Sequence, residues 1–393
     1  MPKKILMVRP APWDSDFKAY NIQEVGLGKA FCRLGYDYDY VCMQTKPHPA
    51  WTFYEFDGCQ GRYIEKSRHR VLRWAFNKEV VSREFLSQYD FVISREYYLP
   101  MTCQIAMHHN NVSLYNGPYW NMMMPKCLSP LYDLIVTSKM RKHLKHVFVK
   151  SEIAKEFLEG KGYHNVITVG VGLDMERFDA EIPIKEETQD LIDYMTTNMC
   201  ILYVGHLDAN KNLPFMLNLY SRLLETVPNL KFVMIGKSCI SATKKLIGKK
   251  DEDYAKEVFA KLPANVRNGI KHIRRIENTQ LKYIYPLAKA FILPSKLEIF
   301  GMVLAEAMYL GAPVVTSKHG GSTTLIGDKD DYGQMIPEFN VDKWAKAVLR
   351  FINDADYASK VKENAHQKVK EEYNWDVIAK KMLEHMNSNS YVI

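Results

Sequence analysis

The sequence predicts an α/β protein with two domains, each built on a doubly wound parallel sheet. Short apolar runs alternate with segments of helical periodicity, which is typical of parallel sheets covered by helices. This pattern begins at residues 4–8 and begins again at 200–204, in a chain of 393 residues. A charged, proline-containing stretch at 179–187 reads as a linker. We therefore expect one domain over residues 1–180 and a second over 181–374.

The N-terminal half contains the elements of a first sheet. Its helical patterns cover 21–34, ended by Gly35, then 101–108, and 152–158 with Ser151 as a suitable N-cap. Gly26-x-Gly28 lies inside the first helix and lacks a third glycine, so we reject it as a dinucleotide-binding motif. Apolar runs predict strands at 4–8, 40–42, 89–94, 112–115, 134–138, 147–149 and 166–171.

The C-terminal half repeats the alternation. Its predicted strands are at 200–204, 231–235, 269–275, 291–293 and 314–316. Its predicted helices are at 214–226, 281–288, 301–309, 341–352, 358–373 and 375–386.

The most informative stretch, Leu293–Gly321, predicts a strand, a loop, a helix and a second strand. In such a parallel unit a ligand lies at the carboxyl end of the strand, before the helix. Glu298 falls in the loop and Glu306 inside the helix, while Phe300 and Gly301 begin the helix, where free N–H groups favour an anion. An extended nucleotide-sugar fits, with its diphosphate between the two carboxylates. The alternative is an ordinary amphipathic helix with two surface glutamates.

This stretch resembles the retaining glycosyltransferases of family 4, which have the GT-B fold. The resemblance implies two Rossmann-like domains that face a central cleft, and a C-terminal helix, 375–393, that packs back on the first domain. It also implies transfer of a sugar from a nucleotide-diphosphate sugar to a hydroxyl, with retention. The matching residues are Pro294-Ser295, Glu298-x-Phe300-Gly301, Glu306-Ala307-Met308, Gly311-x-Pro313-Val314-Val315 and Gly320-Gly321.

A second segment, Gly205–Leu213, is similar to the donor loop of the same family. Lys211 would be the cation on the diphosphate, and His206 stands where the family has an arginine. The resemblance assigns catalysis to Glu298 and Lys211. It assigns donor binding to Gly205, His206, Phe300, Gly301, Met302 and Glu306, and the acceptor side to Asn21, Tyr115 and Asn116.

We expect no metal ion and no cofactor besides the donor. No Asp-x-Asp pair precedes the site, and Asp251-x-Asp253 lies in a charged helical region that a solvated face explains better. Seven cysteines without a C-x-x-C pair favour a reducing cytoplasm and neither zinc nor a disulfide framework. The first apolar run is too short for a signal peptide, and no stretch approaches a membrane span.

The formal net charge of +8 suggests anionic partners. Two basic stretches, Arg62–Lys78 and Lys139–Lys150, either form solvated helix faces or contact an anionic membrane. Nucleic acid ranks low, because aromatic side chains are not spaced as stacking platforms. The expected location is therefore the cytoplasm, or the inner face of the membrane as a peripheral protein.

The sequence as a whole favours a hexosyltransferase that works on a sugar or lipid-linked glycan acceptor in cell-surface polysaccharide or glycolipid synthesis. Two alternatives stay open. One is a GT-B sugar-nucleotide epimerase or phosphorylase. The other is a non-catalytic nucleotide-sugar-binding protein, which the histidine at position 206 suggests.

Overall fold

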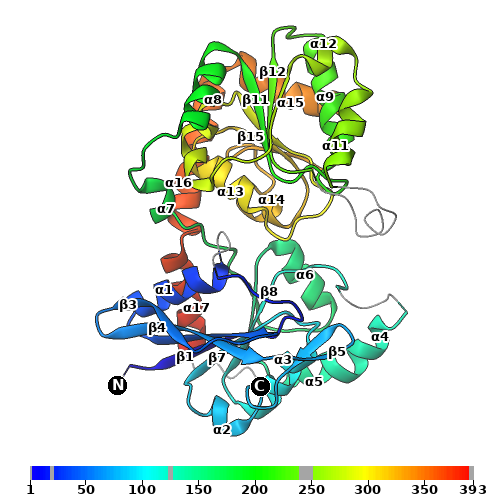
Figure 1. Cartoon of the computed structure of the whole chain (residues 1–393). Helices are drawn as coiled ribbons and strands as arrows, with labels where there is room; N and C mark the ends of the chain where they lie inside the picture. Colours follow the sequence, from blue (N-terminus) through cyan, green and yellow to red (C-terminus); the bar gives the residue numbers. More distant parts are fainter. Residues whose placement is uncertain (1, 18–21, 123–126, 239–250, 389–393) are drawn as a thin grey trace. The chain divides into compact units, whose positions relative to one another are not determined.

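The computed structural model describes residues 2–17, 22–122, 127–238 and 251–388. The chain forms two compact units (Figure 1). The N-terminal unit contains Met1–Asp174 and Glu372–Ile393, and the C-terminal unit contains Met175–Glu371. These limits lie within a few residues of the expected boundaries at 180 and 374. That each unit folds as an independent domain stays a prediction.

The N-terminal unit contains an eight-stranded sheet with the order β10-β9-β8-β7-β1-β2-β4-β3. All neighbours pair in parallel except β3, which pairs antiparallel with β4. The sheet grows in both directions from β1, so its switch point lies between β1 and β7. The strands are β1 (Lys4–Arg9), β2 (Asp37–Gln44), β3 (Trp51–Phe56), β4 (Cys59–Ser67), β7 (Phe91–Arg95), β8 (Val112–Asn116), β9 (His146–Val149) and β10 (Val166–Thr168).

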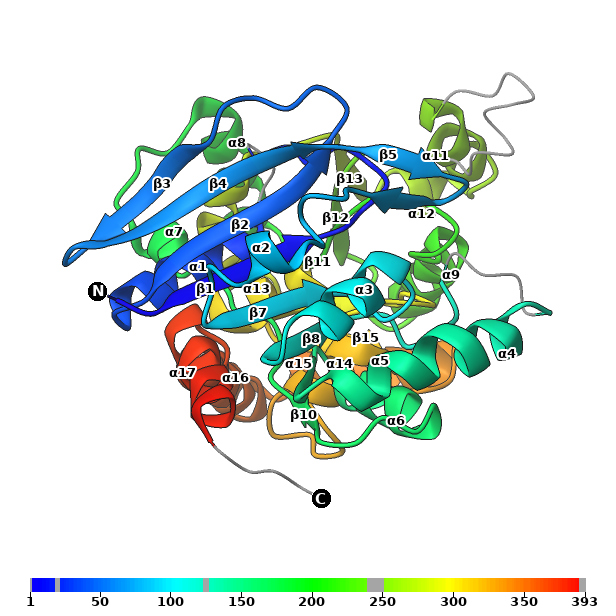
Figure 2. The same ribbon diagram turned by 90° about the horizontal axis from the view of Figure 1, so that it is seen from below.

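A separate hairpin and several helices complete this unit (Figure 2). Strands β5 (His69–Val71) and β6 (Trp74–Phe76) form the hairpin. The helices are α1 (Gln23–Arg33), α2 (Arg83–Leu86), α3 (Pro100–His108), α4 (Ser129–Tyr132), a π-helical segment (Asp133–Thr137), α5 (Ser138–His143), α6 (Glu152–Gly160) and α17 (Trp375–Asn387).

The last helix of the chain, α17, packs against the first, α1. Arg33 of α1 binds the carboxylate of Asp376 through Nε at 2.9 Å and Nη2 at 2.6 Å. The indole of Trp375 fills the space above Gly26, where a Cβ atom would lie 2.2 Å from Nε1. Gly28 similarly leaves room for the ring of Tyr38. These two glycines therefore serve packing, in agreement with the rejection of a dinucleotide motif.

The C-terminal unit contains a six-stranded parallel sheet with the order β13-β12-β11-β14-β15-β16. Counted from its first strand this is 3-2-1-4-5-6, the order of Rossmann folds. The strands are β11 (Cys200–Val204), β12 (Lys231–Ile235), β13 (Ile270–Ile273), β14 (Ala290–Leu293), β15 (Val314–Ser317) and β16 (Gln334–Ile336). The helices are α7 (Glu176–Asp179), α8 (Glu186–Thr197), α9 (Leu213–Leu224), α11 (Asp251–Ala260), α12 (Ala264–Arg267), α13 (Met302–Tyr309), α14 (Gly320–Leu325), α15 (Val341–Asn353) and α16 (Ala355–Glu372).

Most predicted elements are confirmed, including the helix over 301–309 and the positive φ of Gly311 behind it. The strand predicted at 134–138 is wrong, because this run lies in the π-helical segment with Leu134 and Ile135 exposed. A short apolar run does not distinguish a strand from a helix. The helix predicted at 281–288 is two short 3₁₀ segments, Asn278–Tyr283 and Tyr285–Leu287.

The basic stretch at 62–78 is not a helix but the end of β4 and the β5–β6 hairpin. Along β4, Gly61 and Tyr63 are buried while Arg62 between them is exposed. This alternation is the period of a strand with one buried face. The hairpin β3–β4 that precedes it was not predicted.

The contact between α17 and α1 gives a test of the packing. We expect Gly26→Ala to lower the free energy of unfolding by about 1–3 kcal/mol, because the new methyl group overlaps the Trp375 indole. Gly160→Ala is the matched control, since nothing lies within 4 Å of its Cβ position. Urea unfolding of both variants measures the difference. Equal stabilities of the two variants would contradict this account of Gly26.

Candidate functional site

The candidate site lies at the switch point of the C-terminal sheet. Strands β11 and β14 are neighbours there, and each leads at its carboxyl end into one of the two segments that the sequence selected. Residues 205–212 follow β11, and residues 294–301 follow β14. In doubly wound sheets this is the position where ligands bind.

The loop after β11 starts with a close approach of two backbones. Gly205 and Gly236 have φ values of 147° and 155°, and a Cβ on Gly236 would lie 1.8 Å from the carbonyl oxygen of Gly205. The role of Gly205 is therefore to shape the backbone of the loop. The Tyr203 hydroxyl donates to the carbonyl of His206 at 2.6 Å, and His206 itself is exposed.

Lys211 and Glu298, the two predicted catalytic residues, form an ion pair between Nζ and Oε1. Their side chains are 16% and 15% exposed. The backbone N–H of Lys211 donates to Asp208 Oδ1 at 2.8 Å, which fixes the turn that presents the lysine. The structure thus joins residues 87 positions apart in the chain.

The two loops are also joined through their backbones. Asn210 donates from Nδ2 to the carbonyl of Leu297 at 2.9 Å, and its own carbonyl accepts from the N–H of Lys296 at 2.8 Å. Hydrogen bonds between the two loops therefore fix the positions of Lys211 and Glu298 relative to each other.

Helix α13 begins next to this pair. Gly301 is its N-cap residue with φ 73°, a conformation that glycine adopts without strain. The N–H groups of Met302 and Val303 in the first turn have no acceptor within the helix, so they can serve an anion. Phe300, in contrast, is 2% exposed and packs inward, so it shapes the loop.

Glu306 lies just over one turn into α13 and is buried. Asn278 Nδ2 is 3.4 Å and the Tyr285 hydroxyl 3.5 Å from its Oε2. The Asn278 Oδ1 atom is buried and unpartnered in the part of the chain that the structure describes. Asn278 follows β13 at the carboxyl edge of the sheet, a position that the sequence analysis did not use.

His319 and Gly321 support the Glu298 loop, and sequence reasoning missed the histidine. The N–H of Gly320 donates to the carbonyl of Glu298 at 3.2 Å. A Cβ on Gly321 would lie 1.4 Å from the carbonyl oxygen of Phe300, so only glycine fits there. The only signal for His319 was its position directly before the two glycines.

The ring of His319 is buried and its two nitrogens have different partners. Nδ1 accepts from the N–H of Ser322 at 3.2 Å and so caps α14, while Nε2 lies 3.0 Å from Thr316 Oγ1. This places the proton on Nε2. Burial and then the charge of Lys211 lower the pKa of His319 from 6.5 to about 3. The ring is therefore neutral at physiological pH.

The acceptor-side residues belong to the N-terminal unit. Asn21 lies outside the described residues. Tyr115 is buried and its hydroxyl donates to the carbonyl of Gly170 at 2.9 Å. Asn116 is also buried, accepts from the N–H of Tyr97 and donates to the carbonyl of Pro118. Their polar groups hold neighbouring backbone, and an acceptor role for them stays a prediction.

A buried charged cluster lies at the carboxyl ends of β7 and β9. Arg95 pairs with Glu24 of α1 and with Glu96, whose Oε1 lies 3.8 Å from Lys150 Nζ. Burial raises the pKa of Glu24, but Arg95 and Arg9 outweigh it and lower it to about 2. Burial and the charge of Arg95 lower the pKa of Lys150 to about 7.

Many charges of the two basic stretches have partners inside the protein. Arg62 binds Asp39, Lys66 binds Glu79 and Arg68 binds Asp14, while Lys150 is buried. Of the first stretch, Arg70 and Arg73 at the hairpin remain exposed without a carboxylate partner among residues 2–17, 22–122, 127–238 and 251–388. Only some of the basic side chains in the two stretches are therefore available to contact a membrane.

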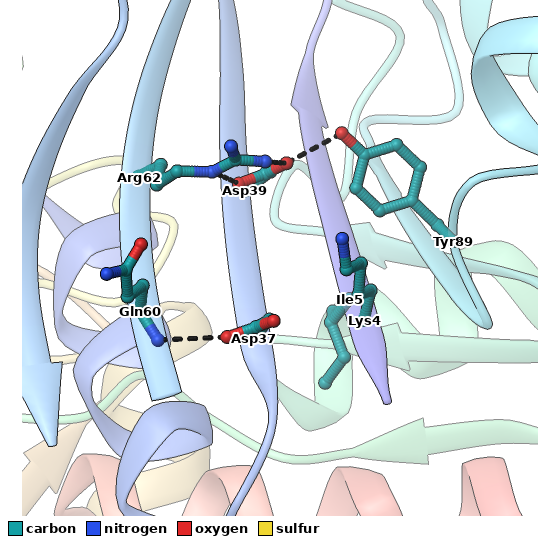
Figure 3. Close-up of a pocket in the computed structure, with 7 residues that line it drawn as sticks. All are labelled: Lys4, Ile5, Asp37, Asp39, Gln60, Arg62 and Tyr89. Carbon is teal, nitrogen blue, oxygen red and sulfur yellow. Dashed lines mark hydrogen bonds and ion pairs between the residues drawn. The ribbon is translucent and has the colours of Figure 1, made fainter. Parts of the chain in front are cut away.

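A polar cavity of about 150 Å³ lies at the opposite edge of the N-terminal sheet, where β1, β2 and β4 begin (Figure 3). Asp39 accepts there from Arg62 Nε at 2.7 Å and from the Tyr89 hydroxyl at 2.7 Å. Asp37 accepts from the N–H of Gln60 at 3.0 Å. These carboxylates are satisfied within the protein, so the cavity adds no candidate to the site.

The described residues contain no candidate metal site and no candidate membrane-spanning helix. Within them no group of three or more His, Cys, Asp and Glu side chains is placed to hold a metal ion. No helix in the same part of the chain is long and apolar enough to cross a membrane.

Residues 187–368 match the family model of glycosyl transferases group 1, which spans most of the C-terminal unit. The matched residues all lie in the C-terminal unit, which is therefore similar to this family. An uncharacterized glycosyltransferase of Methanocaldococcus jannaschii is 28% identical over 211 residues, which are 53% of this chain and 50% of that protein. The chain spans half or less of the length of the first curated relatives that it matches. These similarities agree with the enzyme class expected from the sequence, a glycosyltransferase, and the activity of the whole chain stays a prediction.

Solved structures are similar over both units. Sucrose-phosphate synthase of Thermosynechococcus elongatus has a TM-score of 0.69 at 18% identity, and the match covers 97% of this chain and 98% of that one. HepE of Anabaena, solved in complex with UDP-glucose, has a TM-score of 0.67 at 14% identity, over 97% and 98%. These likenesses confirm the GT-B fold.

The neutral His319 gives a test of the site's support. The unfolded chain takes up a proton on this residue below pH 6.5, whereas the folded chain does so only near pH 3. Stability is therefore lost as the pH falls through this window. His319→Asn keeps an acceptor for the Ser322 N–H, and we expect it to reduce the loss of unfolding free energy between pH 7 and 4.5 by about 2 kcal/mol.

Urea unfolding at the two pH values measures this difference. The exposed His164→Asn is the control and should keep the wild-type dependence on pH. His319→Asn with an unchanged pH dependence would show that His319 is not held neutral.

Proposed function

We propose that the chain is a retaining glycosyltransferase that moves a sugar from a nucleotide-diphosphate sugar to a hydroxyl of a glycan or lipid-linked acceptor. The observation that carries the proposal is the Lys211–Glu298 ion pair beside the first turn of α13, at the switch point of the sheet. A cation, free helical N–H groups and a carboxylate meet there within one unit. These groups suit a diphosphate that is attached to a sugar.

In the ion pair Lys211 neutralises the charge of Glu298. A bound donor offers Lys211 a second anion, its diphosphate. When the ammonium shifts to the diphosphate, the carboxylate of Glu298 becomes available to the sugar hydroxyls. The ion pair therefore keeps both groups in place until the donor separates them.

In the transfer step the bond between the anomeric carbon and the diphosphate oxygen breaks, and the acceptor oxygen bonds to that carbon. Negative charge develops on the leaving diphosphate, where Lys211 and the N–H groups of Met302 and Val303 stabilise it. The acceptor hydroxyl gives its proton to the leaving phosphate oxygen on the same face of the sugar. This route accounts for retention without a protein base, and His319, which stays neutral and bonded on both nitrogens, supports the loop instead.

Glu306 contributes at the other end of the donor. Its carboxylate and the amide of Asn278 form a buried polar pair. Hydroxyls of a ribose would supply donors to the carboxylate and to the buried Asn278 Oδ1 atom, which has no partner in the described part of the chain. We propose this pair as the ribose-binding end of the site.

The donor is tested directly by a thermal-shift and hydrolysis screen with UDP-, GDP- and ADP-sugars beside the free diphosphates. We expect one nucleotide to raise the melting temperature and its sugar to be released slowly without acceptor. UDP-glucose is tested first, because HepE, of similar fold, is solved with it. A sugar that is epimerised by the protein with donor alone would identify the epimerase alternative, and tight binding without any turnover the non-catalytic one. No shift with any donor would contradict the proposal.

The two halves of the ion pair should have separable effects. We expect Lys211→Ala to weaken diphosphate binding and to lower turnover by about 10²–10³-fold, because the developing charge loses its cation. Glu298→Ala should lower turnover by about 10²-fold or more and keep nucleotide affinity, because the sugar and not the diphosphate loses its contact. Steady-state transfer and nucleotide titration measure both.

The exposed pair Lys343–Glu338 of the same unit is a matched control, with side chains 58% and 59% exposed. Alanine at either position should leave transfer within about twofold of the wild type, because exposed pairs contribute little. Full turnover by Glu298→Ala would overturn the assignment of the site.

For the partner of the reaction we propose an acceptor presented at an anionic membrane surface, in cell-surface polysaccharide or glycolipid synthesis. The support is the positive net charge and the exposed basic side chains that remain after the internal pairs are counted. The location that follows is the cytoplasmic face of the membrane.

A further inference from the structure

The N-terminal unit carries exposed apolar side chains on a helical rod that consists of α4, the π-helical segment and α5. Leu131, Leu134 and Ile135 are 54%, 72% and 49% exposed. Large apolar residues at this exposure are unusual when they gather on one element, and such a patch marks an interaction surface.

These side chains share a face with basic residues. Exposed positions recur at Leu131, at the adjacent Leu134 and Ile135, and at Lys139 and Lys142, so that the steps between these positions are three or four residues long. Residues at these spacings lie on one side of a helix. The outer face of the rod is thus apolar in its first half and basic in its second.

The inner face of the rod is anchored. Tyr132 is buried, its hydroxyl donates to the carbonyl of Tyr97 at 3.2 Å, and its ring stacks on Trp74 of β6 with centroids 6.4 Å apart. Met140 of α5 is fully buried. The rod therefore cannot turn its leucines inward without the loss of this packing.

The β5–β6 hairpin repeats the same combination next to the rod. Its tip carries Val71 and Leu72, which are 55% and 79% exposed, between Arg70 and Arg73. Val71 pairs with Trp74, the residue that stacks on Tyr132, so tip and rod are neighbours. Figures 1 and 2 both show β5 and α4 at the same end of the N-terminal unit.

Charge on this surface has one sign. The one acidic residue of the rod, Asp133, is paired with Lys161, and the sequence of the hairpin from 68 to 76 contains no acidic residue. Lys139 and Lys142 pair with no carboxylate in the described ranges, nor do Arg70 and Arg73. Exposed leucines beside unpaired cations suit the acyl boundary and the anionic headgroups of a lipid surface.

We propose that Leu131, Leu134, Ile135 and the hairpin tip form a docking surface that inserts into an anionic lipid bilayer, with Lys139 and Lys142 on its headgroups. This inference rests on the proposed function, in which the acceptor lies at an anionic membrane, and it identifies the surface of the protein that binds that membrane. The basic stretches alone do not identify this surface, because half of the lysines and arginines of the first stretch are paired with carboxylates.

The test uses the full chain and vesicles without any sugar donor, so its outcome is separate from that of the transfer reaction. Co-sedimentation is measured with vesicles of equal parts phosphatidylglycerol and phosphatidylcholine, and with phosphatidylcholine alone. We expect binding to the first to exceed binding to the second by about tenfold and to weaken with salt. Binding to neither kind of vesicle would overturn the proposal.

Two variants and two controls locate the surface. We expect Leu131→Ser with Leu134→Ser, and separately Lys139→Gln with Lys142→Gln, each to lower binding to the anionic vesicles by about tenfold. Ile184→Ser with Met199→Ser removes exposed apolar groups from the other unit, and Lys329→Gln with Lys360→Gln removes two exposed charges there. Both controls should bind as the wild type does.

Circular dichroism and the melting temperature should be unchanged in all four variants, because every substituted side chain is exposed. Wild-type binding by the leucine variant would overturn the proposal. The proposal would also be overturned if the wild-type protein is a dimer that binds no vesicles and the leucine variant is a monomer. The surface would then join two copies of the chain.

Discussion

The contact between the ammonium of Lys211 and the carboxylate of Glu298 is the interaction on which the candidate site depends. It is strong enough to hold two long side chains in place and weak enough to be exchanged, because both remain about one-sixth exposed to water. A fully buried pair would resist an incoming diphosphate, and a fully exposed one would not be ordered. The loops around it fix its position through backbone hydrogen bonds at Asn210 and Gly320.

That arrangement follows from sheet topology more than from the pair itself. Because β11 and β14 are adjacent at the switch point of the sheet, the loops that follow them meet at its carboxyl edge, where doubly wound sheets bind ligands. Gly236 and Gly321 allow backbone approaches that a Cβ atom would block. Close contacts between backbone segments therefore position the loops that form the site.

The sequence predicted this part of the molecule well, because its rules are local. A buried strand, a turn, a helix N-terminus and a glycine behind the helix each leave a pattern over a few residues, so Glu298, Gly301 and Glu306 could be placed before the structure was known. The role of His319 could not, since its partners Thr316 and Ser322 and its burial depend on how α14 packs. The π-helical segment was misread for a related reason: Leu134 and Ile135 are apolar but exposed, and burial is not visible in a short run.

The N-terminal unit uses charge in two different ways. In the N-terminal unit Glu24, Glu96 and Lys150 are buried around Arg95, and the charges of Arg95 and Arg9 hold the pKa of Glu24 at about 2, so its carboxylate stays ionised despite its burial. Basic residues in the sequence therefore do not show where the surface carries unpaired charge, because Lys150 is buried and Arg62 is paired with Asp39. What distinguishes the rod of α4 and α5 is not its share of lysines but their lack of carboxylate partners in the described chain and their position beside exposed leucines. Apolar exposure supplies the driving force for a surface contact, and the unpaired cations select a surface of opposite charge.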